Sequence, residues 1–397
     1  MTDRPSLWIL IVISAVGPFA LNAFVPSLPN LADAFDSDYG TAQLALTLYL
    51  FSVACGQLIY GPLSDRFGRR PTLLWGLTLG CVGSFLCLLA PTMGALLAGR
   101  VAQGLGSCAG LVLARAIVRD VYPRDASASV IGYVTMGMVM MPMIAPGLGG
   151  LLDQNFGWRA SFVAMLGFTL LALVAAYARL PETHHARHAQ LDMIAVLRGG
   201  GALLRSRAFL GYTLAVSFNS IQFFGFLAAG PYLVVTVLGG SPAQYGFWFV
   251  FCAMAYATGN FAAGRWSKSV GLDRMARMGN LLGVLPGVMA LYAAFFVDLQ
   301  IAAFFVPFFL LGFTNGVAQP NLIAGGVSVN PQLAGAASGL IGFIQTAAGG
   351  VATLIMGHTQ DGTMLPLAVM FCVCGTGALL SHVMAMRAVT AAATATK

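Results

Sequence analysis

The chain alternates between long apolar stretches and short polar ones. Each apolar stretch is about 20 residues long, the length that a helix needs to cross a bilayer. A membrane β-barrel would instead show weaker, alternating segments of about ten residues. We therefore predict an all-α integral membrane protein whose twelve membrane-spanning helices cover residues 7–28, 41–61, 72–90, 94–118, 127–150, 159–180, 209–236, 243–265, 275–297, 299–322, 333–356 and 363–387.

Composition supports a membrane protein. Of 397 residues, 58% are hydrophobic and only 8% are charged, whereas soluble domains carry about 25% charged residues. The net charge of +7 is interpreted as anchoring charge rather than as a nucleic-acid surface. All seven cysteines lie in apolar stretches and are interpreted as small packing residues, so neither a disulfide nor a metal site is predicted.

The basic residues gather in alternate loops of this layout. Lys and Arg fall on one side, and Arg159 is the basic residue at the edge of the opposite side. The loops of that opposite side are acidic and hold Asp33, Asp36, Asp38, Asp153, Asp298 and Asp361. Positive charge marks the cytoplasmic side, and an even number of spans places both termini there. The first apolar run is too long for a signal-peptide core and is predicted to be a span. We expect a bacterial inner (cytoplasmic) membrane protein.

The longest polar stretch, residues 182–208, divides the spans into two sets of six. We predict a first bundle over 1–181, a cytoplasmic linker over 182–208 and a second bundle over 209–397. Three glycines of the first half recur 203 residues later in the second half, which indicates duplication. These pairs are Gly56 and Gly259, Gly61 and Gly264, and Gly68 and Gly271. Transporters with such repeats bind substrate between them, near the bilayer midplane.

A charged turn joins the second and third predicted spans. It reads Gly61-Pro-Leu-Ser-Asp65-Arg66-Phe-Gly68-Arg69-Arg70. The two glycines permit a tight return of the chain, and the arginines hold it at one membrane face. We interpret this turn as a hinge and anchor rather than a catalytic loop.

The fourth span carries basic residues that hydrocarbon makes costly. Arg100 and Arg115 lie about 60° apart around the helix and point into roughly one sector. Gln103 follows Arg100 by one turn, and Asn22 of the first span lies at a similar depth. With no Asp or Glu near the middle of any predicted span, two alternatives remain. Arg100 is satisfied by amides and carbonyls, or it awaits an anionic or strongly polar substrate.

The fifth span is rich in proline and glycine. The prolines remove backbone hydrogen bonds and bend the helix, and the glycines let another helix approach closely. This pattern predicts the kinked, tightly packed helix that a moving interface requires. Its residues are Gly137, Pro142, Pro146, Gly147, Gly149 and Gly150.

The spans of the second half carry uncharged polar residues. Each alone is typical of a helix–helix hydrogen bond, but together with aromatic residues they could line a small-molecule pocket. The candidates are Asn219, Gln222, Tyr256, Asn260, Asn315, Gln319 and Gln345, with Tyr49 and Phe223 as aromatic walls. Ser381-His382 has no acid partner in its own span. No nucleophile–base set is found, so neither an enzyme nor a cofactor is predicted.

Four of these motifs resemble one family. The charged turn is similar to the signature of the major facilitator superfamily, and Arg100-x-x-Gln103-Gly-x-Gly106 resembles its fourth-helix motif. Residues 137–150 resemble the fifth-helix motif of twelve-span drug–proton antiporters. Residues 114–122, with Pro26 and Pro29, resemble the Bcr/CflA branch, which exports bicyclomycin and chloramphenicol-type drugs. The resemblance implies two six-helix bundles that alternate access, driven by protons.

The resemblance also implies residue roles. Asp65 is expected to join a charge network with Arg66, Arg69, Arg70 and Arg119. Arg100 is expected to act in proton coupling, often beside an acid of the first helix. Where relatives carry that acid, this chain has Asn22. The coupling role would then move to Asp33, Asp65 or Asp120, or coupling is lost.

We therefore expect a secondary transporter that exports drug-like small molecules or metabolites across the inner membrane by proton antiport. The alternative is an exchanger or uniporter of an organic anion or secreted chelator. A small molecule, protons and the lipid bilayer are the expected partners, nucleic acid is not, and a monomer suffices.

Overall fold

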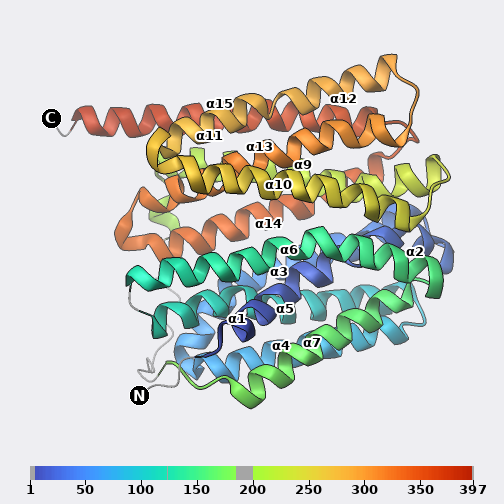
Figure 1. Cartoon of the computed structure of the whole chain (residues 1–397), viewed down its shortest axis with the longest axis horizontal. Helices are drawn as coiled ribbons and strands as arrows, with labels where there is room; N and C mark the ends of the chain where they lie inside the picture. The colour runs from blue at the N-terminus through green and yellow to red at the C-terminus, as the bar shows by residue number, and fades with distance from the viewer. Residues whose placement is uncertain (1–4, 123, 185–199, 396–397) are drawn as a thin grey trace. The chain divides into compact units, whose positions relative to one another are not determined.

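A computed structural model describes residues 5–122, 124–184 and 200–395. Within these ranges all regular structure is helical, and twelve helices are long and apolar enough to cross a membrane. The predicted all-α, twelve-span fold is therefore confirmed. The chain divides into two compact units (Figure 1), the first comprising residues 1–193 with 241–247 and the second 194–240 with 248–397. The partition into 1–181, 182–208 and 209–397 stays a prediction.

The first unit holds the spans up to residue 179. Its helices are α1 (Leu7–Asn22), η1 (Val25–Ser27), α2 (Leu28–Ala34), α3 (Tyr39–Phe67), α4 (Arg69–Leu89), α5 (Met93–Val121), α6 (Arg124–Phe156) and α7 (Arg159–Arg179).

The second unit begins before residue 207, and its helix α10 starts in the segment assigned to the first unit. Its helices are α9 (Arg207–Pro231), the π-helical η2 (Tyr232–Val237), α10 (Pro242–Val270), α11 (Leu272–Leu282), α12 (Leu285–Phe296), α13 (Ile301–Ser328), η3 (Pro331–Leu333), α14 (Ala334–Thr359) and α15 (Leu365–Ala395).

Two predicted spans are interrupted. The first consists of α1, the 3₁₀ turn η1 and α2, because Pro26 and Pro29 lack amide hydrogens and disfavour a helical conformation in the residue before them. The ninth divides into α11 and α12 at Gly283, shortly before Pro286. Apolar composition alone did not reveal these breaks.

The charged turn is shorter than its sequence indicated. Helix α3 continues through Gly61 and Pro62 to Phe67, so the prediction that Gly61 helps the chain to return was wrong. Only Gly68 turns the chain, with a φ of 99° that L-residues rarely adopt. Helix α4 then starts at once with Arg69.

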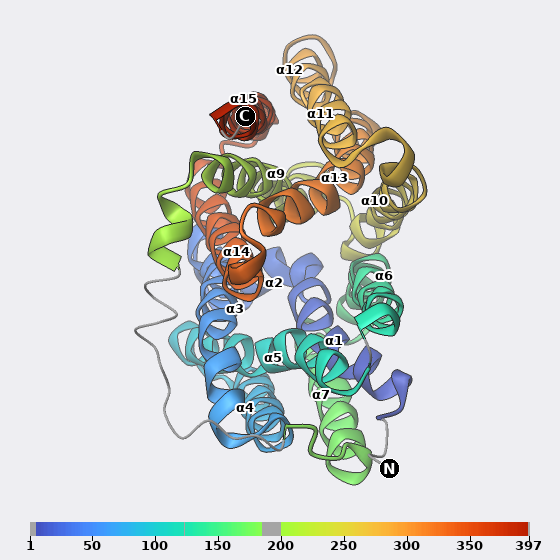
Figure 2. The ribbon, with the colours of Figure 1, turned by 90° about the vertical axis from the view of Figure 1, so that its left-hand side faces the viewer.

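Helix α5 packs against α1, α3 and α4 within the first unit (Figure 2). Close packing with α4 depends on Gly83 and Gly106. A Cβ on Gly83 would overlap the backbone of Gln103, and one on Gly106 would overlap that of Gly80. The α4 and α5 backbones therefore meet directly beside Gln103 and, one turn away, Arg100.

Candidate functional site

Arg100 is enclosed between three helices of the first unit. Its side chain is 0% exposed. Its Nε donates to Ala45 O of α3 at 3.0 Å, and its Nη1 donates to Ala20 O of α1 at 3.2 Å. The guanidinium also lies over the rings of Phe24 and Tyr49, at 4.4 and 4.2 Å from the ring centroids. A cation between two aromatic faces is stabilised by their quadrupoles.

Gln103 extends this arrangement to α4. Its side-chain oxygen accepts from Nη1 of Arg100, and its amide donates to Ser84 Oγ at 2.8 Å. The guanidinium therefore binds carbonyls, an amide and rings, and among the described residues it forms no ion pair. This geometry favours the first of our two alternatives for Arg100. Its Nη2 keeps no hydrogen-bond partner within the described ranges.

Asn22 does not meet Arg100 through its side chain. The Asn22 amide donates to Pro18 O of its own helix at 2.8 Å, and its Oδ1 has no partner in the described structure. Helix α1 instead reaches Arg100 through the backbone of Ala20. Tyr49 reinforces the junction, because its hydroxyl donates to Gly17 O at 2.9 Å.

Two further candidates lie apart from this cluster. Asp33 is exposed near the end of α2. Arg115 lies on α5 four turns from Arg100 and is half-buried. No ion pair of either residue is found in the described parts of the chain.

The charge network at the α3–α4 turn is centred on Arg69. Its Nη1 donates to Asp65 Oδ1 at 2.5 Å, and its Nε donates to Asp120 Oδ2, at the end of α5, at 2.8 Å. Arg69 Nη1 also donates to Ser64 Oγ at 2.6 Å. The network thus joins α3, α4 and α5.

Three other arginines of the expected network lie outside it. Arg70 donates to Tyr177 O of α7 at 2.9 Å, and Arg66 stacks over Phe67. Arg119 is exposed, and no ion pair to it is found among the described residues. The prediction that these three pair with Asp65 is therefore not supported by this geometry.

Glu182 is a participant that the sequence analysis missed. Its carboxylate accepts from the backbone N–H of Arg69 at 3.0 Å and of Arg70 at 3.3 Å, at the start of α4. It also accepts from Thr183 N and His184 N, both at 2.9 Å. An acid at a helix N-terminus satisfies free amides and complements the helix dipole. Only its position directly after a span hinted at this role.

The glycines of α6 let it approach α1. A Cβ on Gly149 would overlap Ala23 O, and one on Gly137 would overlap the Ile11 side chain. Pro142 and Pro146 lie inside the helix, as expected. Gly147 is half-buried and Gly150 is buried.

A second missed acid lies on the same helix. Asp153 is only 4% exposed, and its Oδ2 accepts from the Asn30 amide of α2. The sequence analysis placed Asp153 in a loop, but α6 continues to Phe156. Its spacing of four residues from Gly149 was the available signal, because positions i and i+4 share a helix face.

The polar candidates of the second unit bond mainly to one another and to backbone. Tyr256 OH donates to Gln319 Oε1 at 3.2 Å, and Gln319 donates to Ser220 Oγ at 3.2 Å. Asn219 donates to Asn280 Oδ1 at 3.1 Å. These bonds join α9 to α11 and α13, and α13 to α10, which is the structural role that each amide alone suggested.

The remaining candidates follow the same pattern. Asn315 donates to Asn219 O at 3.2 Å, Gln222 to Phe371 O at 2.9 Å and Asn260 to Tyr256 O at 2.9 Å. Gln345 is half-buried, and its Oε1 has no partner in the described structure.

Phe223 packs within an aromatic cluster. Its ring lies 5.2 Å from Phe224, 6.4 Å from Phe249 and 6.2 Å from Phe308. Phe249 and Phe308 are almost fully buried, so Phe223 forms the edge of a packed core.

These motifs and helices agree with comparisons to known proteins. Residues 7–354 match the Major Facilitator Superfamily. The chain belongs to this superfamily. It is 28% identical over 374 residues to a bicyclomycin resistance protein homolog of Haemophilus influenzae, covering 92% of this chain and 93% of that protein. It is 34% identical over 309 residues to a chloramphenicol resistance protein of Pseudomonas aeruginosa, covering 77% and 71%.

Solved structures show the same fold. A human organic anion transporter, MFSD10, superposes with a TM-score of 0.71 at 18% identity, covering 97% of this chain and 100% of that one. A bacterial homolog of the lysosomal transporter Spinster does so with the same score at 17% identity, covering 96% and 94%. The protein is therefore a multi-pass membrane transporter of the major facilitator superfamily and not an enzyme, and the predicted resemblance to the Bcr/CflA branch is confirmed.

Proposed function

We propose that this transporter exports drug-like small molecules or metabolites across the bacterial inner membrane by proton antiport with alternating access. The observation that carries the proposal is the end-to-end similarity to a bicyclomycin resistance protein homolog, which includes both units. The resemblance of the fifth-span motif to that of drug–proton antiporters supports antiport, and Gly137 and Gly149 of this motif hold α6 directly against α1.

Under this proposal the candidate residues gate the cytoplasmic side, position the helices of the first unit or line the substrate side of the second unit. The network of Arg69, Asp65 and Asp120 gates the cytoplasmic side, together with the turn at Gly68. Arg100, Gln103 and Tyr49 hold α1, α3 and α5 in the arrangement that presents the first unit to substrate. The polar cluster of Tyr256, Gln319 and Ser220 belongs to the substrate side of the second unit.

The proposed orientation in the membrane rests on the distribution of basic residues. Lys and Arg gather at the ends of the spans where α3 meets α4 and where α10 meets α11. Positive loops face the cytoplasm, and this rule supports a cytoplasmic location for both termini. A single chain contains both units, so a monomer suffices for transport.

Growth and transport assays test this proposal. An efflux-deficient host that expresses the wild-type protein should resist some members of a drug panel. The same host expressing Asp65→Asn should be less resistant. Everted vesicles should release protons when a protective drug is added. Transport that ignores both the pH gradient and an uncoupler would contradict proton antiport.

One observation favours the alternative function, which is exchange or uniport of an organic anion. Nη2 of Arg100 has no hydrogen-bond partner in the described structure. If an anion binds there, Arg100→Gln should abolish anion uptake in vesicles. Unchanged affinity for an anionic substrate in that variant would exclude this alternative.

A further inference from the structure

A fully buried histidine lies inside the last span. His382 of α15 is 0% exposed, and neither ring nitrogen has a hydrogen-bond partner within the described ranges. Ionisable side chains inside a membrane span are costly, and those that occur usually belong to ion or proton pathways. Imidazole is also the side chain that changes charge near neutral pH.

A carboxylate that would pair with the protonated form of His382 comes from another helix. Oδ1 of Asp273, on α11, lies 3.6 Å from Nε2 of His382. The same Oδ1 accepts a hydrogen bond of 2.6 Å from the Tyr212 hydroxyl of α9, and the Tyr212 ring lies 5.9 Å from the imidazole. The cluster therefore joins α9, α11 and α15, although the sequence offered no acid within the histidine's own span.

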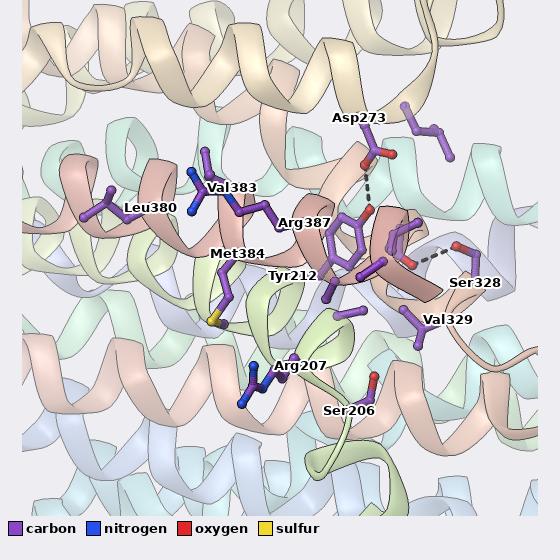
Figure 3. Close-up of a pocket in the computed structure, with 16 residues that line it drawn as sticks. Ser206, Arg207, Tyr212, Asp273, Ser328, Val329, Leu380, Val383, Met384 and Arg387 are labelled. Atoms are coloured by element: carbon purple, nitrogen blue, oxygen red, sulfur yellow. Dashed lines mark hydrogen bonds between the residues drawn. The ribbon is translucent and has the colours of Figure 1, made fainter. Parts of the chain in front are cut away.

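A cavity reaches this cluster from outside. It has a volume of about 1030 Å³ and is lined by both Tyr212 and Asp273 (Figure 3). The Asp273 side chain is 43% exposed, so water in the cavity can exchange protons with it. Leu380 and Met384 are among the apolar residues of its wall, and Arg207 and Arg387 also line it.

The other charges around His382 are basic. Arg274 and Arg277 follow Asp273 on α11, Arg387 lies on α15 itself, and Arg207 begins α9. Helices α12 and α14 also pack against α15. Helix α12 carries no Asp, Glu, Lys, Arg or His, and the one such residue of α14, His358, lies at the other end of the bundle from His382. Asp273 is thus the anionic group that faces this histidine.

We propose that His382, paired with Asp273, is the proton-binding site of the second unit. This inference rests on the proposed proton antiport. It supplies a proton carrier, a role that the uncharged amide of Asn22 cannot fill. Cavity water gives a proton to the Asp273 carboxylate, which passes it to Nε2 of the neutral imidazole, and the new N–H then donates to Asp273 Oδ1. Release returns the proton to water, and no other covalent bond changes. Proton loading therefore ties α15 to α11, while Tyr212 ties the same carboxylate to α9.

Helix α9 connects this site to the polar cluster of the second unit. Ser220 lies eight residues beyond Tyr212, which is about two turns or 12 Å along the helix. Ser220 accepts from Gln319, which in turn accepts from Tyr256. A shift of α9 upon protonation would therefore reach side chains proposed to face substrate.

Proton binding can be measured directly on the purified full chain. The protein has five histidines, so ring-labelled histidine should give few NMR signals, and His382→Gln identifies the one from His382. That signal should titrate, and Asp273→Asn should move its midpoint to lower pH because the imidazolium loses its anionic partner. The signal of exposed His358 should not move. A His382 signal that does not titrate, or that ignores Asp273→Asn, overturns the proposal.

Coupling is measured in a second experiment. Addition of a drug from the panel that the wild-type protein exports should release protons from purified wild-type protein. His382→Gln should lose this release but still exchange drug across vesicles, and His358→Gln should behave as the wild type does. Release that persists in His382→Gln, or that is lost instead in Asp153→Asn, overturns the assignment to His382. If the wild type releases no protons, the proposed antiport itself fails.

Discussion

The guanidinium of Arg69, at the start of α4, donates to the carboxylate of Asp120, at the end of α5, across 2.8 Å. It also donates to Asp65 of α3 across 2.5 Å. The two acids differ in exposure, because the Asp120 side chain is 20% exposed and that of Asp65 is 48% exposed. The strength of the two bonds should differ accordingly, since solvent screens exposed ion pairs.

Replacing each acid by its amide tests this difference. Asp120→Asn should cost about 1–3 kcal/mol, because a largely buried guanidinium loses a charged partner. Asp65→Asn should cost at most about 1 kcal/mol. Thermal unfolding of the purified variants shows which of the two substitutions lowers stability more. Equal losses, or a larger loss for Asp65→Asn, would show that exposure does not govern this network.

A second prediction concerns Arg100. Its planar guanidinium binds Ala45 O and Ala20 O and lies against both Phe24 and Tyr49. Lysine carries a compact ammonium group and cannot reproduce a planar guanidinium that donates two hydrogen bonds while lying between two rings. Both Arg100→Gln and Arg100→Lys should therefore lower the melting temperature and drug resistance, with a cost of about 1–3 kcal/mol for each carbonyl left unpaired.

Arg179 supplies the matched control for Arg100. It is exposed at the end of α7, so Arg179→Gln should leave the free energy of unfolding within about 0.5 kcal/mol of the wild-type value. A stable Arg100→Lys with full resistance would show that charge alone suffices at this position. In that case the ring and carbonyl geometry would not explain why the chain carries arginine there.

The spans were predictable from sequence because hydrocarbon requires long apolar runs. The ends of the helices were not, since a helix continues through polar residues wherever its backbone bonds are satisfied. Helix α3 was predicted to end at residue 61 but reaches Phe67, and α6 was predicted to end at residue 150 but reaches Phe156. Asp153 was consequently misplaced in a loop.

The sequence also did not reveal which groups contact the buried charged and polar side chains. The sequence offered two alternatives for Arg100, and only the fold shows that the backbone of α1 and α3 supplies its acceptors. His382 had no acid in its own span, and Asp273 comes from a helix about a hundred residues earlier. Such pairs depend on helix packing, which a single apolar pattern does not specify.

A third prediction concerns the contact between α6 and α1. A Cβ on Gly149 would overlap Ala23 O, so Gly149→Ala must push the helices apart. Overpacking of this kind costs about 1–3 kcal/mol. Gly132→Ala on the same helix is the control, because a Cβ there meets nothing within 4 Å. Fluorescence-detected gel filtration should show loss of monodisperse protein for Gly149→Ala alone, and equal behaviour of the two variants would refute this account.

The last prediction concerns Glu182, which caps α4 from beyond α7. Its carboxylate accepts four backbone N–H groups, two of them from Arg69 and Arg70 at the start of α4. Glu182→Ala should cost about 0.5–2 kcal/mol, as loss of a helix cap does. Glu182→Gln should cost less, because its amide oxygen still accepts although the charge is lost.

The cap should also influence the Arg69 network, because Arg69 is the first residue of α4. We therefore expect Glu182→Ala to lower the melting temperature and to weaken the effect of Asp120→Asn in the double variant, since neighbouring interactions couple. Asp298→Asn, which changes an exposed acid between α12 and α13 of the second unit, should do neither. Strictly additive losses would mean that Glu182 holds the segment after α7 without positioning Arg69, and a role of Glu182 in the Arg69 network would then be excluded.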